Sequence, residues 1–464
     1  MSSMDTNLLL NANRSTLFAI RYSLTAPRST LYFFMQNKAN FKNAQNDTTD
    51  YVISSYVILR PLGQQKNKAN FNPFPVNLGN FKFVDLCVFI RVFCFAIRLY
   101  TPKTDKNQIV AISPKYCSNA GMFKDVSIIG DGAMATVLAL LLDEKKIAVS
   151  IWGYDGEQLR QFKKARENIK FFPGYKLPAT INFEPDDDRI MKSCDLIVSA
   201  VPCQFMRTVW NRLRDFVPPD VPIVSVAKGI ENDTLLRPTR ILADVLEQKL
   251  EAQNSKLKTA VLSGPTIADE LARKLPATAS VASSDENLAR EIQLTFTTGW
   301  FRVYTNPDVI GVEIAAACKN VIAIAAGIVD GIGAGDNAKA ALLSRGLAEI
   351  TRLGLACGAN SHTFAGLAGL GDLVTTCISP KGRNRLFGER IGRGRDTEQA
   401  LSATNSVVEG VATCKSVVQL AKKMNVDMPI AQAVYEILFC KKPVRKALLD
   451  LMTRELKSEL HDLD

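Results

Sequence analysis

The segment KDVSIIGDGAMATVLALLLDEKKIAVSIW, residues 124–152, decides the fold. A short apolar run ends in glycine, a turn with a second glycine follows, and an apolar helical stretch leads to another apolar run that ends at Trp152. This order predicts a strand, a glycine turn, a helix and a parallel strand within about 30 residues. Such a unit is typical of dinucleotide-binding domains.

The residues of the turn have distinct expected roles. Gly130 makes the tight turn, and Gly132 lets the backbone approach a pyrophosphate at the helix N-terminus. Ala135 takes the third position, where a small residue permits close packing of helix on strand. We expect the whole turn to contact the cofactor, namely Gly130, Asp131, Gly132, Ala133, Met134 and Ala135. The alternative is a tight turn that holds no ligand.

An acidic residue follows the second strand. Asp155 stands 20 residues after Ala135. A carboxylate there accepts hydrogen bonds from the adenosine ribose and repels a 2′-phosphate. No arginine occurs between residues 153 and 159. Both features favour NAD as the cofactor without excluding NADP, and the alternative for Asp155 is a solvated loop position.

Strand and helix patterns continue to alternate as far as about residue 305. Three more apolar runs occur, at residues 194–202, 222–229 and 259–266. The alternation predicts an α/β Rossmann-type domain with a doubly wound parallel sheet over residues 121–308. Ligands bind beyond the carboxyl ends of such strands. The residues that follow these ends and carry larger side chains are Phe205, Lys228 and Thr266.

The pattern becomes helical beyond about residue 310. Four stretches have helical character, at residues 309–329, 338–354, 409–424 and 430–438. Because strand signals are sparse, we expect an all-α C-terminal domain over residues 309–464. The helix that holds Lys319 joins it to the preceding domain.

Lys319 is the most informative single residue. Within eight residues on either side, the only other charged residue is Glu313. Desolvation lowers the pKa of a lysine in such apolar surroundings unless a partner holds its charge. A lysine of this kind exchanges a proton with a substrate hydroxyl. The alternative is a helix lysine whose ammonium group reaches solvent.

Two further polar motifs follow in the helical domain. Asp372 ends the glycine-rich run GLAGLGD, and Arg383 and Asn384 begin the triplet RNR. A guanidinium binds phosphate oxygens through two parallel hydrogen bonds, and an amide fixes the orientation. The triplet therefore favours a phosphate site, with a solvated basic patch as the alternative.

The N-terminal quarter differs in composition from the rest. Residues 1–120 carry 14 basic and 5 acidic side chains of the chain's 57 and 46, so the main body is nearly neutral. We therefore expect no nucleic-acid surface on that body. Residues 1–35 are rich in serine, contain three arginines and have one acid, which is typical of an organelle transit peptide. The alternative is a tail without function, and we expect residues 1–120 to be largely poorly ordered.

Residues 83–100 are the one candidate for a membrane span, but Asp85, Arg91 and Arg98 interrupt them. A spanning helix needs about 20 mostly apolar residues, and a central arginine costs about 2.5–3.5 kcal/mol. We expect no stable span.

A metal centre is not expected either. The 10 cysteines include no C-x-x-C pair, and the chain has only 2 histidines. A zinc framework or a histidine-rich metal site is therefore improbable.

Together the motifs resemble those of the NAD(P)-dependent glycerol-3-phosphate dehydrogenase family. The matching phrases occur in family order between about residues 122 and 440: GDGAMATVLA, SAVPCQF, SVAKGIE, LSGPTIADEL, GVEIAAACKNVIAIAAGI, GDNAKAALLSRGLAEITRLG, TFAGLAGLGDLVTTC, GRNRLFG and VVEGV. The resemblance implies a Rossmann domain, an all-helical domain and a homodimer. It implies reversible hydride transfer between NADH and C2 of dihydroxyacetone phosphate, giving sn-glycerol 3-phosphate for lipid synthesis. With the N-terminal segment, it implies a chloroplast enzyme, the cytosol being the alternative.

The resemblance also implies roles for individual residues. Lys319 is the implied proton donor and acceptor at the C2 oxygen, and Asp372 orients or polarises the substrate hydroxyls. The other implied substrate contacts are Lys228, Gly264, Thr266, Arg383 and Asn384. The implied cofactor contacts outside the glycine turn and Asp155 are Phe205, Lys228, Ala268, Arg383 and Glu409.

The sequence departs from the family pattern at three places. Met134 and Ala135 replace an aromatic residue and a third glycine, and Ala316-Ala317-Cys318 replaces a Gly-Ala sequence. Gly382 stands where the family usually has serine before Arg-Asn. Loss of that hydroxyl is expected to weaken substrate binding by about 0.5–1.5 kcal/mol, one hydrogen bond.

Two other functions share parts of this pattern. A β-hydroxyacid or phosphogluconate-type dehydrogenase has the same two-domain architecture, but the placement of Asp372 and Arg383-Asn384 argues against it. A dinucleotide-binding redox sensor without turnover is the non-enzymatic alternative. The presence of every charged residue that the reaction needs argues against the sensor.

Overall fold

The computed structural model describes residues 17–23, 30–36, 123–192, 194–404, 407–456 and 458–459. The chain divides into two units, Met1–Ser113 and Pro114–Asp464. In the first unit, β1 (Leu17–Ser23) and β2 (Thr30–Gln36) pair antiparallel. The rest of residues 1–122 lies outside the described residues. The structure therefore does not test the predicted transit peptide, the predicted poor order of the extension or the apolar segment 83–100.

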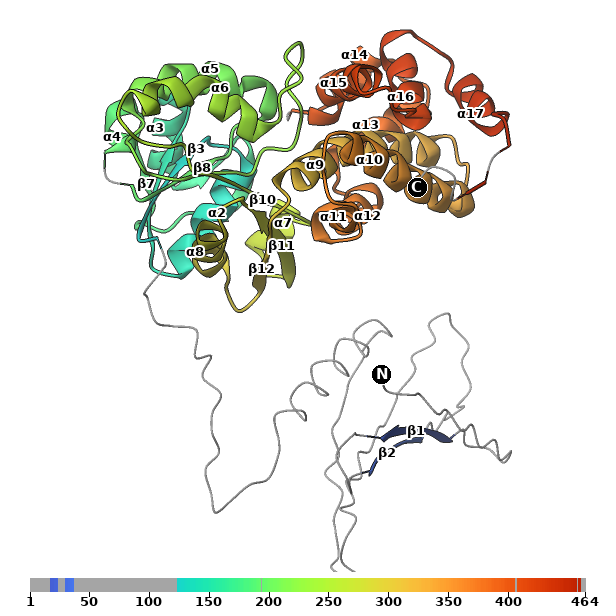
Figure 1. Ribbon diagram of the computed structural model, residues 1–464, viewed down its shortest axis with the longest axis horizontal. Coiled ribbons are helices and arrows are strands. Elements are labelled where there is room, and N and C mark those ends of the chain that lie inside the picture. Colours follow the sequence, from blue (N-terminus) through green and yellow to red (C-terminus); the bar gives the residue numbers. More distant parts are fainter. Residues whose placement is uncertain are drawn as a thin grey trace, which may run out of the picture. The chain divides into compact units, whose positions relative to one another are not determined.

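An eight-stranded sheet forms the centre of the first half of the second unit (Figure 1). Its order is β12-β11-β10-β9-β8-β3-β4-β7. The strands are β3 (Asp125–Ile129), β4 (Ala148–Trp152), β7 (Asn182–Phe183), β8 (Leu196–Ser199), β9 (Ile223–Ser225), β10 (Thr259–Ser263), β11 (Ala277–Ala282) and β12 (Phe301–Asn306). All neighbours are parallel except β10 and β11. The predicted Rossmann-type fold class is confirmed, with one antiparallel pairing that the sequence did not predict.

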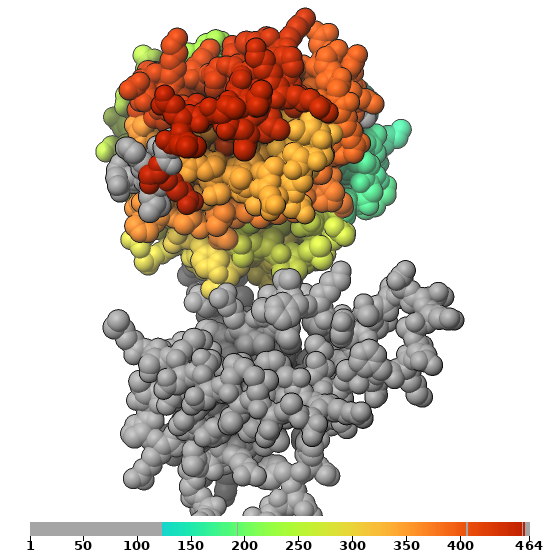
Figure 2. All heavy atoms as spheres, turned by 90° about the vertical axis from the view of Figure 1, so that its right-hand side faces the viewer, coloured from blue at the N-terminus to red at the C-terminus, as the bar shows by residue number. Residues whose placement is uncertain are grey.

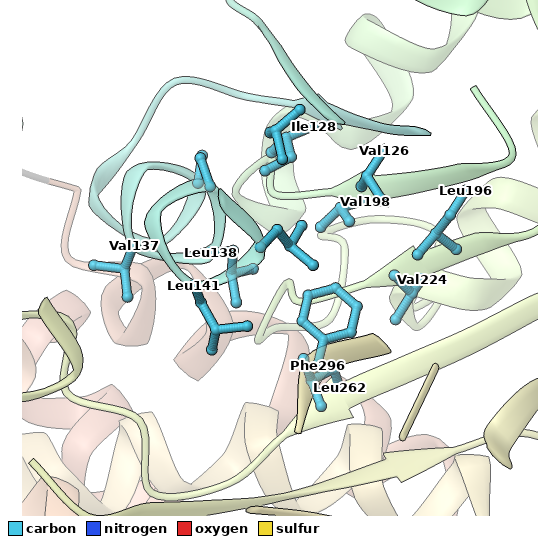
Figure 3. Packing of buried hydrophobic residues seen from close by; sticks show 14 of the residues in the cluster. Val126, Ile128, Val137, Leu138, Leu141, Leu196, Val198, Val224, Leu262 and Phe296 are labelled. Atoms are coloured by element: carbon cyan, nitrogen blue, oxygen red, sulfur yellow. The ribbon is translucent and has the colours of Figure 1, made fainter. Parts of the chain in front are cut away.

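Helices cover both faces of this sheet. They are α2 (Ala133–Glu144), α3 (Gly156–Ala165), α4 (Asp187–Met191), α5 (Cys203–Leu213), α6 (Pro238–Glu251), α7 (Ala268–Ala272) and α8 (Glu286–Phe296). Val126 and Ile128 pack with Leu138 of α2 and Phe296 of α8 (Figure 3). Ile129 belongs to a second cluster with residues of α5 and α6. Adjacent positions of β3 thus enter opposite cores, as expected of a strand buried on both faces.

The second half of the unit is helical. Its helices are α9 (Val309–Gly331), α10 (Asp336–Ala356), α11 (Ser361–Phe364), α12 (Asp372–Ile378), α13 (Arg383–Gly392), α14 (Thr397–Ser402), α15 (Glu409–Lys423), α16 (Pro429–Phe439) and α17 (Val444–Met452). A π-helical turn, η2 (Leu367–Gly371), directly precedes Asp372. Figure 2 shows the C-terminal residues of this domain, in red, lying beside its orange surface. The predicted helical C-terminal domain is confirmed.

Helix α9 is the core of the helical domain. Within the described residues it is the one helix long and apolar enough to cross a membrane. Its most apolar stretch, however, is 89% buried inside the structure. It therefore has the character of a core helix. Helix α13 crosses it closely, because a Cβ on Gly388 would lie 2.0 Å from the carbonyl oxygen of Ile324. This contact brings the middle of α13 against α9, and a hydrogen bond from Asn384 to Asn320 holds the start of α13 beside the middle of α9.

Candidate active site

The glycine turn between β3 and α2 has the geometry that the sequence predicts. Gly130 has φ +120°, and a Cβ there would lie 2.6 Å from the carbonyl oxygen of Ala200, so only glycine fits. A Cβ on Gly132 would meet no atom within 4 Å. Gly132 is the N-cap of α2, whose first turn has no side-chain cap and no acidic residue. The exposed amides of this turn fit a pyrophosphate.

Asp131 turns inward and supports the turn. Its carboxylate accepts a hydrogen bond from Nε2 of Gln158 at 2.6 Å, and its carbonyl oxygen accepts one from Nδ2 of Asn168 at 2.8 Å. Burial raises the pKa of Asp131, although the bond from Gln158 opposes the rise. Asn168 belongs to a hairpin of β5 (Glu167–Asn168) and β6 (Phe172–Lys176) that the sequence did not predict. Of the other predicted turn residues, Ala133 and Met134 are half-buried, and Ala135 lies on the buried face of α2.

Asp155 lies just past β4 and is the N-cap of α3. Its Oδ1 accepts hydrogen bonds from the amides of Glu157 at 3.0 Å and Gln158 at 3.1 Å. Within the part of the chain that the structure describes, its Oδ2 accepts none. One oxygen is thus available for the predicted ribose contact, while the other has a structural role.

Lys319 is brought against Asp372 in the interior of the helical domain. The Lys319 side chain is 6% exposed and that of Asp372 2%. Nζ of Lys319 donates to Oδ1 of Asp372 and, at 2.8 Å, to the hydroxyl of Thr376. That hydroxyl in turn donates to the carbonyl oxygen of Asp372 at 2.7 Å. The lysine is therefore buried and paired.

A second lysine reaches the same carboxylate from the Rossmann domain. Lys228 follows β9, and its Nζ donates to Oδ2 of Asp372 at 2.7 Å and to the carbonyl oxygen of Gly264 at 3.1 Å. Residues of both domains therefore form this cluster, which we call the lysine–aspartate site (Lys228, Lys319 and Asp372).

The charges of the lysine–aspartate site determine its protonation. Burial lowers the pKa of Lys319 to about 8; the neighbouring Lys228 acts in the same direction and Asp372 opposes it. Burial alone would raise the pKa of Asp372, but the two lysines outweigh it and hold that pKa below its usual value. Asp372 is thus a carboxylate at neutral pH, and the ammonium group of Lys319 loses its proton more readily than that of an exposed lysine.

A small, mostly apolar cavity lies between Lys228 and the start of α2. Met134, Lys228 and Thr266 line it together, and its volume is about 20 Å³. The hydroxyl of Thr266 donates to the carbonyl oxygen of Gly264, at the end of β10, at 3.1 Å. Ala268 begins α7 and packs against the sheet core. Three predicted residues from different parts of the sequence thus line one cavity: Met134 from the glycine turn, Lys228 after β9 and Thr266 after β10.

Arg383 and Asn384 lie at the N-terminus of α13 and differ in whether their side chains are free to bind a ligand. Arg383 begins α13, is exposed, and forms no hydrogen bond or ion pair with any residue that the structure describes. Asn384 is buried; its Nδ2 donates to Oδ1 of Asn320 at 2.9 Å and its Oδ1 accepts from the amide of Gly410 at 3.0 Å. The side-chain amide of Asn384 therefore connects α13 with α9 and α15, and it does not face open space where a phosphate could bind.

Glu409 and Phe205 complete the predicted set. Glu409 begins α15, and burial raises its pKa against the opposing charges of Arg383, Lys228 and Lys319. It therefore lies close to the lysine–aspartate site. Phe205, in the first turn of α5, is 52% exposed and leaves a large apolar surface for a ligand.

A wider cavity, of about 520 Å³, lies elsewhere in the helical domain. Its walls come from α9, α10, α16 and α17 and from the residues that follow α17, and it contains none of the predicted site residues. Size alone would therefore choose the wrong place for the chemistry.

Comparison with known proteins decides the family. Models for the N-terminus and the C-terminus of NAD-dependent glycerol-3-phosphate dehydrogenase match residues 125–289 and 308–449. The chain belongs to this family. The glycerol-3-phosphate dehydrogenase [NAD(P)+] of Chlorobium phaeobacteroides (strain BS1) is 47% identical over 335 residues, which cover 72% of this chain and 99% of that protein. The corresponding enzyme of Geobacter sp. (strain M21) is 46% identical over 338 residues, 73% and 99% of the two chains.

Solved structures agree with the family assignment. The glycerol-3-phosphate dehydrogenase of Coxiella burnetii superposes with a TM-score of 0.68 at 33% identity and covers 72% of this chain and all of that one, 100%. The resemblance predicted from the motifs is thereby confirmed, as are the predicted class of oxidoreductase and the use of NAD(P).

Sequence reasoning missed two polar residues of this dehydrogenase site. Thr376 stands four residues after Asp372, so the i, i+4 spacing on one helix was a signal for their contact. Asn320 directly follows Lys319; its Nδ2 lies 3.5 Å from the carbonyl oxygen of Lys228. No local pattern marks Asn320, because its partners are distant in sequence.

Proposed function

We propose that the protein is a glycerol-3-phosphate dehydrogenase that reduces dihydroxyacetone phosphate at C2 and prefers NADH to NADPH. The observation that carries the proposal is the sharing of the Asp372 carboxylate by Lys228 and Lys319. When bound, reduced nicotinamide supplies the hydride. The preference for NADH rests on Asp155, whose charge disfavours a 2′-phosphate.

The residues of the chain supply the proton and the charge. The ammonium group of Lys319 polarises the C2 carbonyl oxygen and donates a proton to it; in the reverse direction the neutral amine accepts the proton. Asp372 keeps both lysines in place through its two oxygens. Arg383 is exposed and forms no hydrogen bond or ion pair with the described residues, so it is available to pair with the substrate phosphate.

Steady-state kinetics on the full chain tests this function. Oxidation of NADH and of NADPH is followed by absorbance with dihydroxyacetone phosphate, a β-ketoacid and a 2-ketoacid as alternative substrates. We expect turnover with dihydroxyacetone phosphate and a higher kcat/KM with NADH. Turnover of another ketone in its place would favour the rival dehydrogenases, and cofactor binding without any turnover would favour the sensor.

We also propose that residues 1–35 direct the protein to the plastid stroma, where it supplies glycerol 3-phosphate for lipid synthesis. Their serine and arginine content supports this proposal, as does the start of the family match only at residue 125. A fluorescent reporter fused after residue 120 should enter plastids, whereas a reporter in the cytosol would contradict the proposal.

We propose a homodimer on the basis of the family resemblance. Light scattering on the purified chain should give close to twice the mass of 51.0 kDa expected for one full chain, less any segment that is removed. A monomeric mass would contradict this proposal.

A further inference from the structure

A buried carboxylate of the helical domain caps a helix of the Rossmann domain. Glu313, near the start of α9, is 1% exposed. Its Oε1 accepts from the amide of Thr239 at 2.7 Å; its Oε2 accepts from the Thr239 hydroxyl at 2.8 Å and from Nη1 of Arg237. Thr239 lies in the first turn of α6, which has no side-chain cap from its own N-cap residue. Glu313 therefore binds an amide that α6 would otherwise leave without a partner.

The same two segments meet again at the lysine–aspartate site. Lys319 lies six residues beyond Glu313 on α9, about 9 Å along the helix axis. Lys228 lies in the loop that runs from β9 to α6 and ends at Arg237. Near the start of this loop, Lys228 contacts Asp372. Where the loop ends and α6 begins, Glu313 attaches the chain to α9.

The middle of this loop has its own anchors. The carbonyl oxygen of Ile230 accepts from Nε2 of Gln204 at 2.7 Å and from the hydroxyl of Ser416 at 2.8 Å. Glu231 pairs with Arg207 at 2.8 Å. These contacts hold the middle of the loop on α5 and α15. Nδ2 of Asn320, on α9, lies 3.5 Å from the carbonyl oxygen of Lys228 itself, and Glu313 supplies the hydrogen bonds that attach the far end of the loop to the same helix.

We propose that Glu313 is a positioning residue for the reaction: by holding the start of α6 on α9, it keeps Lys228 against Asp372 and beside Lys319. Glu313 acts through Lys228 and does not touch the substrate. The distances within the lysine–aspartate site depend on how the two domains dock, because Lys228 comes from the Rossmann domain, whereas Lys319 and Asp372 come from the helical domain. The inference rests on the dehydrogenase activity proposed above.

The charges around Lys319 distinguish this role from a purely structural one. The groups that face it are Asp372, Lys228 and Glu409, with the thiol of Cys377 nearby. Burial and the charge of Lys228 both lower the pKa of Lys319. If Lys228 moves away, Lys319 loses a like charge and its pKa rises.

The test is Glu313→Gln in the full chain, which keeps an acceptor for Thr239 but loses the charge that faces Arg237. We expect kcat/KM for dihydroxyacetone phosphate to fall by about tenfold or more, because small misplacements of catalytic groups have effects of that size. We expect the alkaline limb of the reduction profile to move to higher pH, and NADH affinity to stay within about twofold, because the glycine turn is untouched. Thr239→Val removes only the hydroxyl contact with Glu313, so it should move the alkaline limb of the pH profile to higher pH by a smaller amount. This variant takes the place of Glu313→Gln if Glu313→Gln does not fold.

Asp285→Asn is the matched control. Asp285 caps α8 in the same domain by accepting from the amides of Asn287 at 2.9 Å and Leu288 at 3.1 Å, away from the loop. Asp285→Asn should change Tm little, because asparagine caps a helix about as well as aspartate, and only Glu313→Gln should shift the alkaline limb of the pH profile. If Glu313→Gln left the alkaline limb of the pH profile unshifted and had the same kcat/KM as Asp285→Asn, the inference would be overturned.

A readout without turnover separates this inference from the proposed function. Amine-reactive labelling of the full chain, read by mass spectrometry, should modify Lys228 faster in Glu313→Gln than in the wild type and the control. An unchanged labelling rate would overturn the positioning role even if the chain is an active dehydrogenase. An inactive wild type would instead count against the proposed function.

Discussion

Lys228 and Lys319 bind opposite oxygens of one carboxylate although they come from different domains. Nζ of Lys228 lies 2.7 Å from Oδ2 of Asp372, and Nζ of Lys319 donates to Oδ1. Two ammonium groups and one carboxylate leave a net positive charge in a place that is nearly closed to water. Reduction of a ketone develops negative charge on its oxygen, so such a site stabilises the transition state.

Replacement of Lys319 by methionine tests the proton donor. We expect kcat to fall by about 10²–10⁴-fold, the usual contribution of a positioned acid or base. NADH binding, measured by fluorescence titration, should be nearly unchanged because the glycine turn is intact. Lys339→Met is the control, since Lys339 pairs with Asp330 at 2.9 Å in the same domain. A Lys319 variant with the wild-type rate would refute the assignment.

The direction of the reaction should set the sign of its pH dependence. The pKa of Lys319 is lowered to about 8. Reduction requires the ammonium form, so its kcat/KM should be steady below this pKa and fall as the pH rises through it. Oxidation requires the free amine and should rise through the same range. Profiles measured in both directions that change in the same sense would contradict Lys319 as the shared acid and base.

Removal of the Asp372 charge should affect both stability and pH dependence. In Asp372→Asn the two lysines lose their counter-charge, so the pKa of Lys319 should fall and the alkaline limb of reduction should move to lower pH. Breaking a buried ion pair in this way costs about 3–5 kcal/mol, which urea unfolding measures. A limb that moves to higher pH would show that another group titrates.

The two glycines of the turn should respond differently to alanine. Gly130→Ala places a Cβ 2.6 Å from the Ala200 carbonyl oxygen at φ +120°, so we expect lower stability. The penalty for such a backbone conformation is about 1–3 kcal/mol. Gly132→Ala meets no atom within 4 Å and should fold as the wild type. The second glycine of such a turn lets the backbone approach the pyrophosphate, so a Cβ there should hinder cofactor binding and raise KM for NADH by about tenfold, or 1.4 kcal/mol. Equal Tm values for the two variants would contradict this distinction.

Local patterns were sufficient for the main architecture. The glycine turn with its flanking strands predicted the Rossmann domain, and the apolar run around Lys319 predicted the core helix. The antiparallel β11 could not be predicted from its own residues, because pairing direction depends on how the chain returns after β10 through the short α7. The β5–β6 hairpin escaped notice because its first strand has only 2 residues, too few for a periodicity.

The site was predictable by residue type but not by partner. Lys319 in apolar surroundings indicated proton chemistry, and the family resemblance implied the role of Asp372. Nothing near Asn384 in the sequence, however, indicates that its side-chain amide is bound by Asn320, 64 residues away. Such contacts depend on helix packing, in this case the close crossing of α9 and α13 at Gly388. Residues whose roles depend on long-range partners need the fold itself.

Gly382 provides the last test, because the family usually has serine there. A Cβ at this position would lie 2.9 Å from the carbonyl oxygen of Thr376 and 3.3 Å from that of Ser379. Serine therefore does not fit the present loop, and it would displace Thr376, whose hydroxyl holds Lys319. We expect Gly382→Ser to lower kcat and Tm without lowering KM for dihydroxyacetone phosphate. Gly299→Ser is the control, since a Cβ there meets nothing within 4 Å. A several-fold lower KM with unchanged kcat would mean that the loop has room for the hydroxyl and that its absence alone weakens phosphate binding.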